Sequence, residues 1–288
     1  MHSHARVAGT WNSSARHRVG RRFASTVLGT AAVLIGGCQI RVQPGSDSIF
    51  SAFAGPTPSE AAAWAIDRYS ANNRYRGTLL LSSFPFASEP VYLQVFQDNI
   101  KDPDAGVRAA SARALGNHGD IEHAPLLRDA LRDDDVLVRR EAARALQRIH
   151  APEVVETLLI SVREPDLLRP DEPGEADSGV RTEAALALGQ YAESRVLDEL
   201  VRALADSSLA VNVAARESLK TLTGQDFAMD RRAWLDWLGA TAQPFAAKRV
   251  YYYPIFTRDK LWYEHLPFVP QPPNEPESTP VGMALPDR

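Results

Sequence analysis

Two short polar clusters are the places in this sequence where side chains of suitable type stand close enough together to do chemistry. The segment NHGDIEH (117–123) holds two histidines and two carboxylates, and three consecutive aspartates occupy 133–135. Such groups ligate transition metals or divalent cations. However, polar residues are also expected in turns between helices, and aspartates favour helix N-termini. The chain has no GxSxG, GxxxxGK[ST] or HExxH motif. We therefore predict no catalytic residue, no metal site and no cofactor.

The sole cysteine, Cys38, ends an N-terminal segment with the features of an export signal. Five arginines lie within 6–22, and an uncharged apolar stretch follows at 24–37. As a helix this stretch reaches roughly 21 Å, short of a bilayer core of about 30 Å. The sequence therefore predicts that residues 1–37 are a signal peptide and not a membrane-spanning helix.

The Ile-Gly-Gly at 35–37, directly before the cysteine, resembles a bacterial lipobox. The resemblance implies cleavage after Gly37 and a diacyl chain on the Cys38 sulfur, so the membrane would be a partner of a lipid-anchored envelope protein. Gln39, by the same resemblance, favours the outer membrane or the periplasmic face. Two or three acyl chains anchor stably where one does not. Residues 38–56 would be a flexible tether; the alternative is an unmodified cysteine in an ordinary secretory signal or a core helix.

Charge is distributed unevenly along the chain. Five of its 32 basic residues and none of its 36 acidic residues lie in the first 37 positions. The remainder therefore carries 27 basic against 36 acidic side chains. Because phosphate backbones are bound by clustered Lys and Arg, we do not expect a nucleic acid partner.

An internal repeat accounts for the body of the chain. DAGVRAASARALG at 104–116 recurs at 135–147, 177–189 and 208–220, with one insertion of 11 residues in the middle interval. Each copy begins with a residue that can cap a helix, and small or apolar residues follow its valine at four and eight positions. Apolar segments at 124–132, 152–163 and 195–204 are expected to form the partner helices. The unit is therefore an antiparallel helix pair that buries its apolar face only by stacking.

These repeats resemble HEAT repeats, in particular the short HEAT-like repeats of phycobilisome lyases. The acidic cap, the Val-Arg pair and the Ala-Leu-Gly ending carry the resemblance over 89–222. It implies an all-α fold, an α-solenoid of stacked antiparallel helix pairs. In the family an acid and an arginine tie adjacent repeats together. The residues in those positions here are Asp102, Asp133, Asp206, Arg108, Arg139 and Arg181, with Asn212 in the arginine position of the last copy.

The segments that flank the repeats are predicted to complete the stack. Residues 57–88 begin with a capping box and are interpreted as a degenerate first helical unit, with Arg76 in the arginine position. Residues 223–240 contain two tryptophans three apart and are predicted to form a capping helix. The tail at 241–288 is rich in aromatic residues and then in proline. We expect it to be irregular and to lie along the solenoid or to dock a partner.

A scaffold that binds proteins without catalysis is the function that this architecture favours. The candidate binding residues lie off the apolar stripe or in the tail, and the acidic insertion at 167–179 joins them. They are Arg113, Arg140, Arg144, Tyr252 and Trp262. Two alternatives stay open: a subunit associated with an enzyme, as the likeness to lyase repeats suggests, and a purely structural envelope lipoprotein. The protein partner and the oligomeric state are unknown.

Overall fold

The computed structural model describes residues 56–166, 168, 171–255, 257–267, 269, 272 and 274–284. The predicted signal peptide, Cys38 and nearly all of the tether therefore lie outside the described residues. The described part is all-helical, apart from one isolated bridge between Ile149 and Val281. None of the described helices is both long and apolar enough to span a bilayer. The helices are α1 (Pro58–Ala65), α2 (Ala71–Ser82), α3 (Pro90–Asn99), α4 (Ala105–His118), α5 (Ala124–Ala130), α6 (Val136–Ala145), α7 (Val155–Ser161), α8 (Ser178–Leu188), α9 (Ser194–Ala203), α10 (Leu209–Thr223) and α11 (Arg231–Ala240), with short 3₁₀ turns η2 (Ile121–His123), η3 (Pro152–Val154) and η4 (Trp262–His265).

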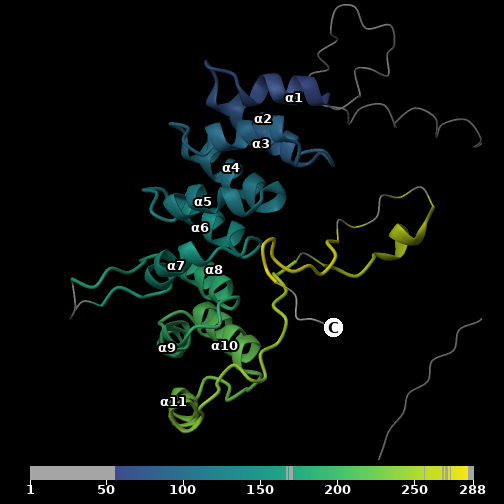
Figure 1. The fold of residues 1–288 in the computed structure, drawn as a ribbon. Helices are drawn as coiled ribbons and strands as arrows, with labels where there is room; N and C mark the ends of the chain where they lie inside the picture. Colours follow the sequence, from purple (N-terminus) through teal and green to yellow (C-terminus); the bar gives the residue numbers. More distant parts are fainter. Residues whose placement is uncertain are drawn as a thin grey trace, which may run out of the picture. The chain divides into compact units, whose positions relative to one another are not determined.

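The helices alternate between two rows, which confirms the predicted α-solenoid (Figure 1). The second helices of the pairs, α2, α4, α6, α8 and α10, pack successively on one another. The first helices, α1, α3, α5, α7 and α9, each pack against a second helix and form the other row. Each repeat thus contacts its neighbours in sequence, as expected of a solenoid.

Local sequence explains where the second helices begin. The side chain of Asp104 accepts a hydrogen bond from the Val107 N–H, and Asp135 and Asp177 cap α6 and α8 in the same way. Ser208 occupies the equivalent N-cap position of α10, but its side chain makes no capping bond. All four predicted N-cap positions are therefore confirmed, but only the three aspartates make the predicted capping hydrogen bond.

The predicted apolar stripe is the core of the stack. Its valines and the residues four and eight positions later are all completely buried. Close packing also explains the Gly of the Ala-Leu-Gly ending, because a Cβ on Gly116 would lie 2.5 Å from the Cβ of Ala145. Helices α4 and α6 can approach this closely because no side chain stands between them.

The predicted first unit is a real helix pair, but its arginine was misplaced. Arg76 lies over the Trp64 ring, 5.2 Å from its centroid, and takes no part in a tie between repeats. Arg74 pairs with Asp102 instead, at 2.6 Å. The reason is the position of the cap: Ser70 caps α2, and Arg74 follows it by four residues, as Arg108 follows Asp104.

At the other end the structure separates the last repeat from the capping helix. Helix α10 continues to Thr223 and ends at Gly224, which is left-handed with φ 72°. Helix α11 begins at Arg231 within the predicted range of 223–240, and Asp230 caps it by accepting from the Ala233 N–H. Trp234 on α11 is completely buried and donates its indole N–H to the Ala228 carbonyl.

The tail returns along the solenoid from α11 past α10 and α8 to α6 (Figure 1). The Arg249 N–H donates to the Thr221 carbonyl at the end of α10, and Tyr251 is buried. The Tyr253 ring lies on Arg148, 4.6 Å from the guanidinium carbon. The Val281 N–H donates to the Arg148 carbonyl, and the His150 N–H donates to the Val281 carbonyl. Much of the tail is therefore bound by the chain's own repeats.

Candidate functional site

One arginine in each of four repeats joins its own loop to the next repeat. Arg108 donates from Nε and Nη2 to both carboxylate oxygens of Asp133, at 2.8 Å each. Its Nη1 donates to the Asp102 and Pro103 carbonyls of its own loop. Each tie is thus a bidentate ion pair that also satisfies loop carbonyls.

The same arrangement recurs along the stack, and we call the set the loop ladder. Its pairs are Arg74–Asp102, Arg108–Asp133, Arg139–Glu175 and Arg181–Asp206. Sequence reasoning missed Arg74 and Glu175. Glu175 stands five residues before Val180, as Asp102 stands five before Val107, and a search for either acid would have found it. Each predicted arginine pairs with the acid of the following repeat.

Asn212 ends the loop ladder. Its amide nitrogen donates to the Ala203 and Asp206 carbonyls, which is the task that Nη1 performs in the arginines. It reaches no following acid in the described part of the chain, and α11 follows in place of another repeat. The substitution therefore keeps the loop closed where no further tie is made.

Two acids of the loop ladder, Asp102 and Asp133, are held in their charged form. Burial raises the pKa of Asp133, but the hydrogen bonds from Arg108 and from the Asp135 N–H outweigh it, and the pKa lies below its ordinary value. The same balance lowers the pKa of Asp102, with Arg74 as the partner. These carboxylates serve as structural ions.

A second set of ion pairs crosses the outer face of the second helices, and we call it the surface series. Arg113 donates to Glu141 at 2.9 Å, Arg144 contacts Glu141 at 3.4 Å, and Arg144 also pairs with Glu183. The arginine side chains are 50% and 47% exposed, whereas Glu141 and Glu183 are 13% and 14% exposed. Two of the predicted binding arginines therefore stand above their own carboxylate partners and present positive charge outward.

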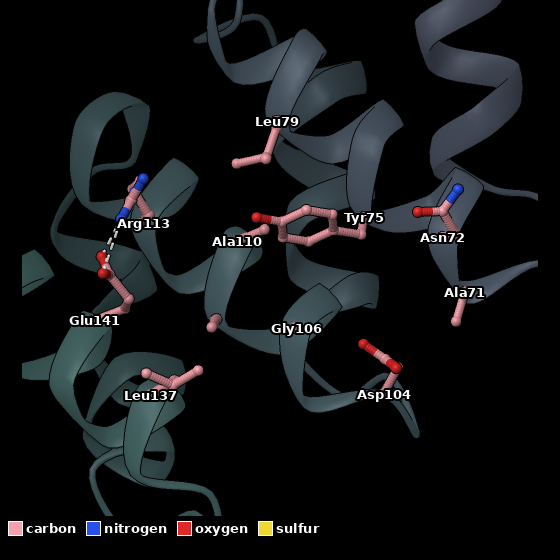
Figure 2. A pocket seen from close by; sticks show the side chains of 11 residues that line it. Ala71, Asn72, Tyr75, Leu79, Asp104, Gly106, Ala110, Arg113, Leu137 and Glu141 are labelled. Carbon is pink, nitrogen blue, oxygen red and sulfur yellow. Dashed lines mark hydrogen bonds and ion pairs between the residues drawn. The ribbon is translucent and has the colours of Figure 1, made fainter.

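A groove of about 490 Å³ lies between α2, α4 and α6, and we call it the Tyr75 groove (Figure 2). Tyr75 lies across it, with Leu79 on one side and Leu137 on the other. Gly106 and Ala110 line the groove and leave it open because their side chains are small. The Arg113–Glu141 pair closes one end. The lining is an apolar slot with charged groups at its rim, a form typical of ligand sites.

A second pocket, of about 500 Å³, lies where the tail meets the surface series, and we call it the tail pocket. Asn117, Arg144 and Arg148 line it from the solenoid, while Ile255 and Glu275 line it from the tail. Arg113 and Glu141 line both pockets. The Tyr75 groove and the tail pocket are therefore neighbours on one face. Sequence reasoning did not single out Tyr75 or Leu137, since neither fits the repeat pattern.

The remaining predicted binding residues lie apart from this face or on its edge. Arg140 pairs with Asp177 at 3.0 Å and lines neither pocket. Tyr252 is half-exposed on the outer side of the tail. Trp262 is 81% exposed in η4, beside Tyr263. The structure thus brings together Arg113 and Arg144 but not Arg140, Tyr252 or Trp262.

The histidines of NHGDIEH have structural contacts. His118 Nε2 lies 2.7 Å from the Ser82 carbonyl, and His123 Nδ1 accepts from the Asp120 N–H. His123 Nε2 lies 3.0 Å from the Gln97 amide nitrogen. In the described ranges no three His, Cys, Asp or Glu side chains gather closely enough to hold a metal ion.

Two family models match the repeats. The model of HEAT repeats matches residues 93–169, and that of the PBS lyase HEAT-like repeat matches 180–206. The chain is similar to YibA of E. coli (21% identity, 63% of this chain and 67% of that one, TM-score 0.44). It is also similar to the CpcE–CpcF complex of phycocyanin lyase from Nostoc sp. PCC7120, with 21% identity over 56% of this chain and 96% of that one and a TM-score of 0.41. A designed armadillo repeat protein is similar with 14% identity over 67% of this chain and 95% of that one and a TM-score of 0.45. A search of curated proteins finds no match. The chain thus contains HEAT repeats, including one of the PBS lyase HEAT-like type.

Proposed function

We propose that this protein is a non-catalytic scaffold that binds a protein partner on the row of second helices. The observation that carries the proposal is the pair of adjoining pockets on that row, the Tyr75 groove and the tail pocket. The row is rigid, because each second helix packs on the next and the loop ladder ties the repeats together. A rigid surface loses little conformational entropy on binding.

The proposal includes attachment to the membrane of the cell envelope through a lipid on Cys38. Its support is the sequence: the basic and apolar segments before the cysteine and the Ile-Gly-Gly at 35–37. Mass spectrometry of the membrane fraction tests it by searching for a lipidated peptide that begins at Cys38. A Cys38→Ser variant should leave the membrane fraction. If it stays there unchanged, the lipid anchor is wrong.

Affinity capture with a groove variant tests the binding role. The chain, tagged at its C-terminus, is cross-linked briefly, solubilised in mild detergent and captured from its native envelope. Leu137→Glu places a charge in the Tyr75 groove and should remove a partner that the unchanged chain captures in near-stoichiometric amounts. Leu209→Glu is the matched control, because Leu209 is an exposed leucine in the first turn of another second helix and lines neither pocket.

The outcomes separate the classes of function. Loss of the partner in Leu137→Glu but not in Leu209→Glu supports the scaffold. Equal capture by both variants places the binding surface elsewhere. If the unchanged chain captures nothing, the protein is not a binding scaffold under these conditions of expression, and the structural alternative takes its place.

A further inference from the structure

The chain's own tail shows what kind of ligand the second-helix row accepts. Residues 249–253 run along the second-helix row: the Arg249 backbone N–H donates to the Thr221 carbonyl at the end of α10, Tyr251 is buried, and the Tyr253 ring lies on Arg148, just beyond the end of α6. The residue between the two tyrosines, Tyr252, points outward and is exposed. An alternating contact of this kind is what an extended peptide makes with a surface.

The tail also shows which charge the row accepts. The carboxylate of Glu275 lies 2.6 Å from Arg148 Nη2, so a guanidinium just beyond the end of α6 is bound by an acidic side chain of the tail. The Tyr253 ring covers the same guanidinium. One acidic and one aromatic residue together hold the tail at this point.

The tail pocket adjoins this contact, since Arg148 and Glu275 both line it. Its walls are apolar at Pro254 and Ile255, and three arginines line it: Arg113, Arg144 and Arg148. The carboxylates that pair with the first two lie beneath them and are largely covered. Glu141 and Glu275 also line the tail pocket, and Asp104 lines the Tyr75 groove. At the patch formed by Arg113 and Arg144, however, the arginines are about half-exposed and the carboxylates are not, so a ligand meets positive charge there.

We infer that the tail pocket and the Tyr75 groove bind an extended acidic segment of a partner protein, in continuation of the docked tail. An acidic side chain of that segment would lie on Arg113 and Arg144, and an apolar side chain would enter the slot between Leu79 and Leu137. The inference rests on the proposed binding role and names the chemical class of the partner. It fits the tail's own contact, in which Glu275 and Tyr253 hold Arg148 in the same way.

Fluorescence anisotropy with short labelled peptides tests this inference on the full chain in mild detergent. The probes are eight-residue peptides in which leucine alternates with glutamate, glutamine or lysine. The glutamate peptide should bind, and its affinity should fall steeply as salt is raised, because the arginines are exposed. The glutamine and lysine peptides should bind at least about tenfold more weakly, the difference expected for a lost charge-assisted hydrogen bond.

Variants of the chain assign that binding to the pocket. Arg113→Gln with Arg144→Gln should weaken the glutamate peptide by about tenfold or more. Arg195→Gln is the matched control, since Arg195 is equally exposed and paired with glutamates but lies on the first-helix row.

Several results would overturn the inference. They are equal binding of the glutamate and lysine peptides, no binding of either, or full binding by the double arginine variant. The proposed scaffold role survives these results if the Leu137→Glu variant still loses its captured partner. It fails separately, if the unchanged chain captures no partner at all.

Discussion

The loop ladder and the surface series use the same chemistry in the same repeats, yet they differ in where the charges lie. In the loop ladder, Arg181 and Asp206 are only 3% and 2% exposed, and the arginine also donates to two loop carbonyls. In the surface series, Arg113 and Arg144 are about half-exposed. The first set is surrounded by protein, and the second by water on one side.

This difference separates structure from binding. A buried arginine that lost its acid would remain desolvated and unpaired, so the loop ladder is locked into one arrangement. An exposed arginine that lost its acid would be solvated, so it can exchange partners at little cost. The two sets should therefore respond oppositely to mutation: the loop ladder through folding, the surface series through binding.

The largest effect is expected for Asp206→Ala. It leaves the buried Arg181 guanidinium without its bidentate partner and also removes the acceptor of the Ser208 N–H. We expect a loss of about 3–5 kcal/mol in the free energy of unfolding. Denaturant unfolding followed by circular dichroism measures it. If Asp206→Ala loses less unfolding free energy than a surface-series variant, the proposed difference between the loop ladder and the surface series is wrong.

A smaller effect is expected for Glu175→Ala, in a more solvated pair. Glu175 accepts from Arg139 at 2.7 and 3.0 Å and from the Asp177 N–H at 2.8 Å. Arg139 is partly exposed, so water replaces some of the lost bonds, and we expect a loss of about 1.5–3 kcal/mol. Asp171→Ala, in the same insertion and exposed, is the control and should leave the unfolding free energy nearly unchanged. If the two variants behave alike, the insertion does not contribute a tie to the ladder.

The loop ladder should also make stability depend on pH in the acid range. The pKa values of Asp102 and Asp133 are lowered in the folded chain, whereas an unfolded aspartate titrates at about 3.9. Below that pH the unfolded chain takes up protons that the folded chain does not. Stability is therefore complete above about pH 4 and falls as the pH drops toward the folded-state values. Unfolding measured between these limits should show a weaker slope in Asp102→Asn with Asp133→Asn; an unchanged slope would assign the acid sensitivity to other groups.

The sequence predicted the helices and their order more completely than the ion pairs of the loop ladder. It predicted those ion pairs more completely than the residues that line the pockets. The apolar stripe and the aspartate caps are local patterns, so the helices and their order followed from them. The ladder joins residues 25 to 36 positions apart, and its acid can be Asp or Glu, which is why Glu175 was missed. Arg76 was chosen over Arg74 because the first unit has no valine to set the register, and only the Ser70 cap does so.

The pockets depend on features that no single repeat encodes. The Tyr75 groove needs a tyrosine in one repeat, small residues in the next and Leu137 in a third. The tail pocket needs Glu275 and Ile255 to return to α6 from more than 100 residues away along the chain. Arg113 and Arg144 were singled out by their position off the stripe, but their partners beneath them became visible only when α4, α6 and α8 were stacked.

The smallest effect on stability is expected for Arg113→Ala and Arg144→Ala. These variants test most directly whether the surface series differs in role from the loop ladder. Each removes an exposed ion pair, and solvent compensates for most of the loss, so each should change the unfolding free energy by less than about 1 kcal/mol. Arg113→Ala should be the milder of the two, since Arg144 contacts both Glu141 and Glu183. Parallel measurements of unfolding and of partner capture decide the matter. An unfolding free energy close to that of the unchanged chain, together with weakened partner capture, would assign the exposed arginines to binding. A loss of stability equal to that of Glu175→Ala would instead make the surface series a second structural ladder. Its charges would then be fixed and unable to exchange partners.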